Sequence, residues 1–356
     1  MKITTLRQLL LVLIIITSGE LSSFGQVKAL GGNTIPIEEL DQFVKSKMDS
    51  LKLPGLSIAV INDGKIVYHR ALGLANIDSN KKVDDSTMFE AASLSKTTFA
   101  FLVMKLVEGG KINLDKPLYE YLPNPDIDYD DRYKLITARM CLDHTTGFPN
   151  WRSDTKGAQL YIQFIPGTKY SYSGEGYEYL TNVVAHLTHT NLRNLGQLYA
   201  QQVGRPLGLQ HFYFTWNDFL EQHKATGYYD HRPDSRWHPI IFRAASSLHT
   251  EAVDYARFLI AVMDGKGLKR ASIDEMLKEQ INIPNDTPGS HDAFGLGFYM
   301  EPTKYGVRYS HNGNNGDFTS GFLFYREQKF GYVFFTNCEN GAEFNKALRL
   351  FLTGSK

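Results

Sequence analysis

The sequence predicts an α/β protein of the α+β type, with one antiparallel sheet built from both ends of the chain. A hairpin pattern follows the first helix within residues 36–90, helical spacing dominates residues 91–264, and strand patterns return in residues 265–352. Helices at the N- and C-terminal ends are expected to flank the sheet. We therefore expect one domain over residues 36–352, a sheet lobe interrupted by a mostly helical lobe, with a cleft between them.

The composition is that of a globular chain with balanced charge. Of the 356 residues, 42% are hydrophobic, which is enough to bury a sizeable core. Lysine plus arginine and aspartate plus glutamate each number 38 and form no block of like charge, so a nucleic-acid partner has no support. The expected partner is a small-molecule or peptide substrate.

The N-terminus has the features of an export signal. Lys2 and Arg7 precede an apolar run over residues 9–16, and small residues follow it, which predicts a signal peptide over residues 1–25 with cleavage before Gln26. The run is far shorter than the ~20 residues that a spanning helix needs, so no permanent membrane span is expected. We expect the protein to be periplasmic or secreted.

The first half of the sheet follows an amphipathic helix. Apolar residues at helical spacing predict this helix over residues 37–51. Strands are predicted over residues 56–61 and 66–72. The Asn-Asp-Gly sequence at residues 62–64 is a strong hairpin signal because its glycine can adopt a positive φ.

Helical signals dominate the middle of the chain. After Ser93, apolar residues recur at the spacing of one buried helical stripe until Gly109 and Gly110 end the helix. A later helix is predicted between Thr250 as its cap and Gly265 as its stop. Its inner face is expected to carry Val253, Ala256, Ile260 and Met263.

The second half of the sheet is predicted near the C-terminus. Strand patterns cover residues 294–300, 305–311, 320–325 and 330–336. A final amphipathic segment beginning near Phe344 is expected to form a helix that packs on the sheet rather than on a membrane.

Ser93 and Lys96 lie one helical turn apart at the start of the predicted buried helix. Residues at positions i and i+3 share a helix face, so the Lys96 amine can approach the Ser93 hydroxyl. The positive end of the helix dipole disfavours a protonated lysine there, and a neutral amine can serve as the base that a serine nucleophile needs. The alternative interpretation is that Ser93 is a helix cap or that the two residues form a solvated surface pair.

The Ser-x-x-Lys spacing is itself a weak pattern. It also occurs at Ser79 with Lys82 and at Ser153 with Lys156. Neither of these pairs opens a helix with apolar periodicity, so we expect no chemistry from them.

Two later segments carry further candidate residues. Residues 166–177 combine turn formers with the start of a helical run and could present Tyr172 at a cleft, although alone they could be an aromatic-rich loop. Residues 309–316 follow a strand. Gly313 permits close approach of the backbone to a ligand, and the amides of this segment could face an oxyanion.

These three segments, in this order, resemble the serine β-lactamase and penicillin-binding protein superfamily, whose motifs are Ser-x-x-Lys, Tyr-x-Asn or Ser-x-Asn, and Lys-Thr-Gly. The class C β-lactamase and D-alanyl-D-alanine carboxypeptidase branch is the most similar. Residues 142–148 resemble the His-Thr-Ser-Gly-Leu turn of that branch, and residues 294–298 resemble its Tyr-Gly-Leu-Gly-Trp strand. The likeness runs from about Ile37 to Leu352.

The resemblance implies a role for each catalytic candidate. Ser93 would be the acylated nucleophile, Lys96 the proton acceptor or relay beside it, and Tyr172 the group that carries the proton to the leaving group. The expected activity is that of a secreted or periplasmic serine hydrolase that forms an acyl-enzyme on Ser93. Its substrate would be a β-lactam, a D-amino-acid peptide or a carboxylic ester.

The resemblance also implies the substrate-binding residues. His311 takes the place of the lysine of the third motif, followed by Gly313 as the motif's glycine. The backbone N–H groups of Ser93 and Asn314 would form the oxyanion hole. No metal and no organic cofactor is implied.

Two departures from the motifs concern the substrate. Gly174 stands where many relatives carry asparagine, which removes a side-chain amide that would hold an acylamido group. His311 replaces a lysine that would attract a carboxylate, and with an ordinary pKa near ~6.5 a histidine is often neutral at pH 7. An alternative for His311 is a strand-end residue held by the backbone.

Two other function classes were weighed. A non-catalytic binding or assembly protein on the same fold is the main alternative, because a fold does not fix a function. An α/β-hydrolase needs Gly-x-Ser-x-Gly, and the nearest match, at residues 55–59, fails at its last position and lies in a predicted strand. The two cysteines, Cys141 and Cys338, have no metal-ligand spacing, and we expect two buried thiols rather than a disulfide.

Overall fold

The structure is a computed structural model that describes residues 25–234, 238–284 and 291–354. The predicted signal peptide over residues 1–25 therefore lies, apart from its last residue, outside the described residues. Within the described ranges, no helix has both the length and the apolar character needed to cross a membrane.

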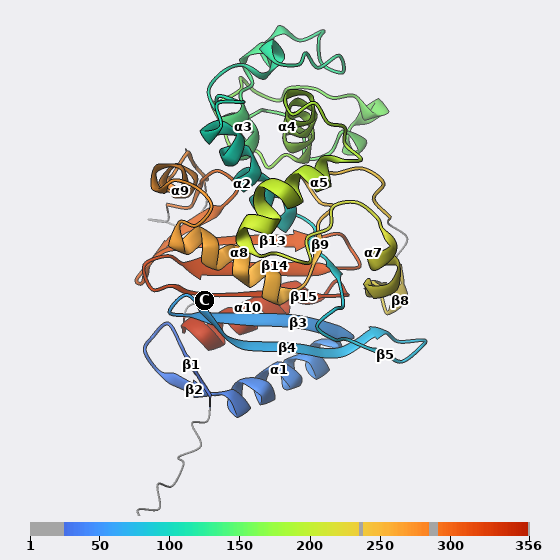
Figure 1. The fold of residues 1–356 in the computed structure, drawn as a ribbon, viewed down its shortest axis with the longest axis vertical. Helices are drawn as coiled ribbons and strands as arrows, with labels where there is room; N and C mark the ends of the chain where they lie inside the picture. The colour runs from blue at the N-terminus through green and yellow to red at the C-terminus, as the bar shows by residue number, and fades with distance from the viewer. Residues whose placement is uncertain (1–24, 235–237, 285–290, 355–356) are drawn as a thin grey trace, which may run out of the picture.

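A nine-stranded antiparallel sheet forms the base of the molecule (Figure 1), and its strand order is β10-β11-β12-β13-β14-β15-β3-β4-β5. The strands are β3 (Gly55–Asn62), β4 (Lys65–Asn76), β5 (Lys81–Lys82), β10 (Ile281–Asn282), β11 (Ala293–Phe294), β12 (Tyr299–Thr303), β13 (Gly306–Asn314), β14 (Thr319–Tyr325) and β15 (Phe330–Thr336). The two halves join where Tyr332 of β15 lies opposite Val60 of β3. The predicted sheet built from both chain ends is confirmed.

The hairpin between β3 and β4 follows the turn chemistry of its sequence. Asn62 pairs with Lys65 across the turn, and Asp63 and Gly64 adopt φ values of 49° and 70°. Two consecutive positive φ values are typical of the tight turn that matches the twist of antiparallel strands.

Helices cover both faces of the sheet (Figure 1). On one face lie α1 (Ile37–Leu51) and α10 (Gly341–Thr353), whose Phe43 and Phe351 rings stack with centroids 4.1 Å apart. On the other face, α8 (Ala252–Asp264) contacts β3, β4 and β15. Two separate apolar cores result, one on each face, because side chains alternate along a strand.

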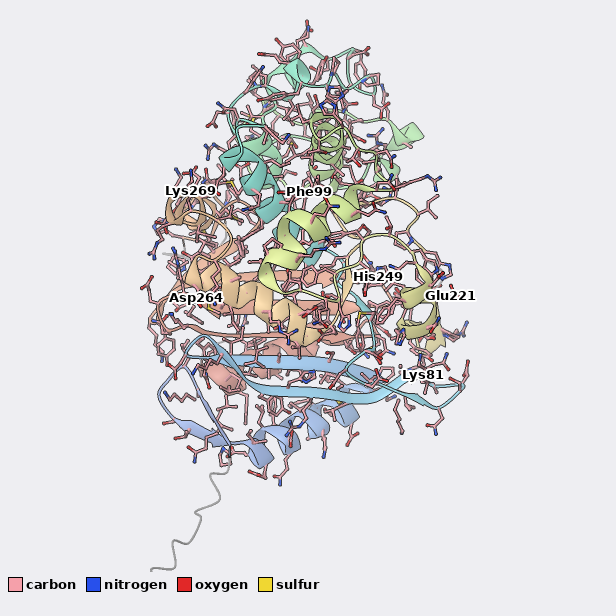
Figure 2. The ribbon with its side chains drawn as sticks, viewed as in Figure 1. Lys81, Phe99, Glu221, His249, Asp264 and Lys269 are labelled. Carbon is pink, nitrogen blue, oxygen red and sulfur yellow. The ribbon has the colours of Figure 1, made fainter. Side chains whose placement is uncertain are left out.

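The rest of the chain forms the helical lobe around α2 (Leu94–Glu108). Its helices are α3 (Ala138–Leu142), α4 (Gly174–Leu187), α5 (Leu195–Tyr199), α6 (Arg205–Leu207), α7 (Asp218–His223) and α9 (Arg270–Leu277). Short strands lie outside the main sheet: β1 (Gln26–Lys28) pairs with β2 (Thr34–Pro36), β6 (Phe89–Glu90) with β9 (His249–Thr250), and β7 (Tyr228–Tyr229) with β8 (Arg232–Pro233). Figure 2 labels Phe99 of α2 within this upper part and Asp264 of α8 beside the sheet. The helix α8 thus packs on the sheet, although the sequence division grouped it with the helical lobe.

Three local expectations need correction. The cap of α8 is Glu251, whose carboxylate accepts the N–H groups of Val253 and Asp254, whereas Thr250 belongs to β9. Val253 is only half-buried and is not part of the main core, so the predicted inner face of this helix is wrong at that residue, whereas Ile260, also half-buried, packs against the core. The single strand predicted over residues 294–300 is two strands, because Gly297 takes a φ of 86° and turns the chain between them.

The cysteines and the second helix add two findings on burial. Cys141 and Cys338 are free and buried, as predicted. Helix α2 is buried nearly all round rather than along one stripe, since even Ser95, Lys96 and Thr97 are inaccessible to solvent. A helix enclosed on all sides can hold polar side chains away from water, which matters for the site described next.

Candidate active site

Ser93 lies at the N-terminal end of α2, between the helical lobe and the sheet. The preceding residue, Ala92, has a φ of 48°, a strained conformation for a residue with a side chain and one that is common at functional sites. The Ser93 side chain accepts no hydrogen bond from the first turn of the helix. Ser93 thus occupies the N-cap position of α2, but its side chain does not cap the helix, and its hydroxyl is available to other groups.

Lys96 is the immediate partner of Ser93. Its Nζ atom lies 3.1 Å from the Ser93 Oγ atom and donates to the Ala245 carbonyl at 2.8 Å. The side chain is fully buried and forms no ion pair with any carboxylate in the described part of the chain. Burial lowers the pKa of Lys96 from 10.5 to about 7, against an opposing effect of the more distant Glu178 charge. A substantial fraction of Lys96 is thus neutral near pH 7.

Tyr172 approaches the same hydroxyl from the segment that precedes α4. Its side chain lies within hydrogen-bonding reach of Ser93, and its ring centroid is 4.8 Å from the Lys96 Nζ atom. Burial raises the pKa of Tyr172 above the ordinary value of a phenol. The phenol is therefore protonated at neutral pH and can donate a proton or a hydrogen bond.

His144 supports Tyr172 from the side opposite the cleft. The two rings lie 4.2 Å apart, and the His144 Nδ1 atom accepts the backbone N–H of Ser173 at 3.1 Å. His144 itself has a φ of 62° and no solvent exposure. Burial, reinforced by the Lys96 charge, holds the pKa of His144 well below its ordinary value, so the ring is neutral.

His311 lies on β13, across the cleft from Tyr172, with ring centroids 6.1 Å apart. Its Nδ1 atom lies 2.8 Å from the Asn312 carbonyl, which can only accept, so Nδ1 carries the proton. Burial and the Lys96 charge lower the pKa of His311 to about 3. The ring is therefore neutral, and its Nε2 atom is an acceptor with no partner among the described residues.

Gly313 allows β13 to approach the segment that leads to Ser93. A Cβ atom at this position would lie 2.3 Å from the Ser320 Oγ atom and 2.4 Å from the Ala91 carbonyl oxygen, distances that no side chain could occupy. Asn314 ends the strand, opposite Thr319. Within the described ranges the Ser93 N–H donates to no group, which is what an oxyanion donor requires. The participation of Asn314 in an oxyanion hole stays a prediction.

A buried ion pair lies beside the segment that precedes Ser93 and the segment that follows β13. The Lys224 Nζ atom lies 2.8 Å from Glu90, which precedes Ser93, and Glu90 also accepts the Asn315 side-chain N–H at 2.6 Å. Residues 90 and 315 are thereby fixed to each other. The sequence analysis missed this tie because no spacing rule relates residues 90, 224 and 315.

The sequence analysis also missed Glu178. Burial raises the pKa of this carboxyl to about 7, and Ala245, whose carbonyl binds Lys96, donates its backbone N–H to Glu178 at 3.4 Å. Glu178 thus acts on Lys96 through charge rather than through contact. A glutamate inside an amphipathic helix gives no signal of such a role.

A cavity of about 390 Å³ opens beside these residues. It is lined by Tyr170, Tyr172, Phe294, Tyr299, Glu301, Arg308, Ser310, His311, Asn312 and Arg349. A larger cavity, of about 700 Å³, is lined by residues of α1, β4 and the Cys338 loop and by none of the candidate residues. Of the candidate residues, Tyr172 and His311 line the smaller cavity, whereas Ser93 and Lys96 are not among its lining residues. Gly313 and Asn314 line a further cavity of about 300 Å³.

One group of side chains in the described ranges has metal-ligand spacing. His211, Glu251 and Asp254 offer ligand atoms within 4.8 Å of one another. The Glu251 carboxylate already accepts a backbone N–H group at the start of α8. The Asp254 carboxylate accepts the backbone N–H of His211 and pairs with Arg257. We interpret this group as a helix cap and not as a metal site.

The other two Ser-x-x-Lys pairs have no comparable surroundings. Ser79 and Ser153 are both exposed, and their hydroxyl groups donate to Asn76 and Asp154.

Comparison with solved structures defines the class of fold. An octameric penicillin-binding protein homologue from Pyrococcus abyssi superimposes with a TM-score of 0.76, covering 90% of this chain and 79% of that chain at 22% identity. A D-alanine carboxypeptidase AmpC from Burkholderia cenocepacia superimposes with a TM-score of 0.74, covering 88% and 99% at 19% identity. The fold is that of the penicillin-binding proteins.

The family follows from the sequence. A family model described as Beta-lactamase matches residues 40–353, so the chain belongs to the Beta-lactamase family. The putative penicillin-binding protein PbpX of Bacillus subtilis (strain 168) is 25% identical over 305 residues, which are 80% of this chain and 71% of that protein. Protein flp of Staphylococcus aureus (strain MW2) is 23% identical over 210 residues, 54% of this chain but only 41% of that relative's length.

Proposed function

We propose that this protein is a serine hydrolase that forms an acyl-enzyme on Ser93 and acts outside the cytoplasm on an amide or an ester. The observation that carries the proposal is the Lys96 amine, buried without a carboxylate and 3.1 Å from the Ser93 Oγ atom. An uncharged amine at that distance is a base matched to a serine nucleophile near neutral pH. The location outside the cytoplasm rests on the sequence of residues 1–25 alone.

In the proposed acylation step, the Ser93 Oγ atom bonds to the acyl carbon while its proton passes to the Lys96 Nζ atom. The oxyanion that forms would be held by the backbone N–H groups of Ser93 and Asn314, each contributing about 3 kcal/mol. The tetrahedral intermediate then expels the leaving group, which takes a proton from the Tyr172 hydroxyl. Proton transfer from Lys96 to Tyr172 restores both groups.

Deacylation reverses the same sequence with water as the nucleophile. Water loses a proton to the Lys96–Tyr172 pair as its oxygen bonds to the acyl carbon. The bond from that carbon to the Ser93 Oγ atom then breaks, the pair returns the proton to Oγ, and the carboxylic acid is released. The neutral His311 ring, whose buried Nε2 atom is an acceptor without a partner among the described residues, supports recognition of a hydrogen-bond donor on the substrate rather than of a carboxylate.

The test is covalent labelling of Ser93 by a fluorophosphonate, followed by peptide mass spectrometry. Labelled wild type and unlabelled Ser93→Ala would support the proposal, and a folded wild-type protein that takes up no label would reject it in favour of a non-catalytic binding protein. A panel of short acyl esters, D-Ala-D-Ala peptides and a chromogenic cephalosporin then selects the substrate class through the activity lost in Ser93→Ala.

A further inference from the structure

Hydrogen bonds and an ion pair hold a short segment, residues 149–152, against the start of α4, which closely follows Tyr172 in the sequence. The Ser173 hydroxyl donates to the Pro149 carbonyl at 2.8 Å, and the Gly174 N–H donates to the Asn150 carbonyl at 3.0 Å. At the C-terminal end of this segment, Arg152 forms an ion pair with Glu175 at 2.8 Å. These bonds fix the Trp151 ring, which is half-buried against the main core.

The position of Gly174 relative to the cleft follows from the backbone. Ser173 is extended, with φ −138° and ψ 118°, so the residues on either side of it project toward the same face. Tyr172 faces Ser93, and we infer that a side chain at position 174 would project toward the same cleft. The lining of the 390 Å³ cavity includes Tyr172 but neither Gly174 nor Trp151.

That side-chain position is already filled by Trp151. A Cβ atom on Gly174 would lie 2.7 Å from Cη2 and 2.8 Å from Cζ3 of the indole, and 2.9 Å from the Asn150 carbonyl oxygen. Gly174 begins a right-handed helix, so its backbone conformation does not require glycine. The glycine is required because the six-membered ring of Trp151 occupies the space.

We propose that Trp151 is a specificity-determining residue that gives the cleft an apolar wall where a side-chain amide at position 174 would otherwise stand. This inference rests on the proposed acyl-enzyme function and names its substrate class: carboxylic esters whose acyl group carries no acylamino substituent. An acylamino group placed against the indole edge loses hydrogen bonds to water and gains none, which penalises it by ~10-fold or more. A plain aliphatic acyl group meets no such penalty.

Asn150 is the competing candidate for the same role. Its side chain is exposed, and its Oδ1 atom accepts the Gly174 N–H at 3.1 Å. Because that carboxamide oxygen is committed to the backbone, we assign the discrimination to Trp151, and Asn150→Ala serves as the matched control.

The experiment compares two substrates that differ only by an acetamido group: p-nitrophenyl propanoate and the p-nitrophenyl ester of N-acetyl-D-alanine. For the wild type we expect kcat/KM to favour the propanoate by at least ~10-fold. Trp151→Ala, and Trp151→Phe in case the alanine variant does not fold, should reduce this preference several-fold. Gly174→Asn alone should lose stability. Trp151→Gly with Gly174→Asn removes the contact with the indole but keeps the 2.9 Å contact with the Asn150 carbonyl oxygen, so it should recover part of that stability and favour the acetamido ester.

Equal kcat/KM values for the two esters in the wild type would overturn the inference, as would a preference unchanged in Trp151→Phe or abolished by Asn150→Ala. Labelling of Ser93 by a fluorophosphonate, a reagent without an acylamino group, is run on every variant. Failure of labelling in the wild type rejects the proposed function, whereas normal labelling with an unchanged ester preference rejects only the role of Trp151.

Discussion

Two buried lysines near the chain segment that carries Ser93 have contrasting partners. Lys224 is 4% exposed and lies 2.8 Å from the Glu90 carboxylate. Lys96 is fully buried, and among the described residues its amine hydrogen-bonds to the neutral oxygens of Ser93 and Ala245 and pairs with no carboxylate. A buried charge is costly unless it is paired. The ion pair with Glu90 compensates for the burial of the Lys224 charge. Lys96 has no such partner, and burial instead lowers its pKa so that the uncharged amine is favoured.

The contrast distinguishes a structural lysine, Lys224, from Lys96, which we propose takes part in the reaction. The Glu90–Lys224 pair fixes the chain before Ser93 to Asn315, and so sets the distance between the nucleophile and the end of β13. Lys96 joins Ser93 to the Ala245 carbonyl by hydrogen bonds but forms no ion pair among the described residues. An amine without a carboxylate partner can lose its proton more readily and act as a base. Burial alone therefore does not distinguish the two roles, whereas the presence of a counter-ion does.

The largest expected effect is the loss of chemistry in Lys96→Met. Removing the base should lower kcat/KM and the rate of Ser93 labelling by ~10³-fold, within the usual range for a general base. Lys105→Met is the matched control on the same helix, where the amine donates only to the exposed Gly267 carbonyl, and it should retain activity. Equal rates in the wild type and Lys96→Met would end the assignment of Lys96 as base.

The second effect is a loss of stability in Lys224→Met. Leaving Glu90 buried without its partner should lower the free energy of unfolding by about 3 kcal/mol, measured by urea denaturation. Lys28→Met removes an exposed pair with Asp63 and should cost less than about 1 kcal/mol. If both substitutions cost the same, the Glu90–Lys224 pair is not the tie described here.

A third, smaller effect concerns the pH dependence of stability. The pKa of Lys96 is about 7 in the folded protein and near 10.5 when unfolded, so between these values the unfolded chain binds the extra proton. Wild-type stability should therefore rise, relative to Lys96→Met, as the pH increases from about 7 toward 10.5. Paired urea titrations across this window measure the difference. A constant difference would show that the Lys96 pKa is the same in both states.

The smallest effect is a shift in the pH profile of Glu178→Gln. The Glu178 charge raises the pKa of Lys96, so its removal should move the acid limb of the Ser93 labelling rate to lower pH. Since burial also raises the pKa of Glu178 to about 7, the wild-type limb reports both groups together. Glu221→Gln, an exposed change, should leave the profile in place. A shift to higher pH would contradict the arrangement.

The sequence alone predicted the fold and the contact between Ser93 and Lys96, which lie one helical turn apart. The alternation of apolar and polar residues and their helical spacing predicted β3, β4, β13, β14, β15, α1 and α10. The i, i+3 spacing predicted that Lys96 lies beside Ser93. These features depend on neighbours in the chain, which a pattern can express.

The features that the sequence did not predict depend on residues far apart in the chain. The tie from Glu90 to Lys224, the effect of Glu178 on Lys96 and the filling of position 174 by Trp151 all arise from packing between distant segments. In the sequence, the residues involved are isolated and belong to no repeating helical or strand pattern, so no pattern indicates their roles. The depth of burial of α2, which lowers the pKa of Lys96, likewise comes from tertiary enclosure and not from its own sequence.

The most direct measurement of the central claim is the second-order rate constant for fluorophosphonate labelling of Ser93 as a function of pH. With Lys96 unpaired and buried, the rate should rise with increasing pH and level off above an inflection near pH 7. An inflection near 10.5, the ordinary value for lysine, would show that Lys96 keeps its proton in the folded protein and would contradict the account.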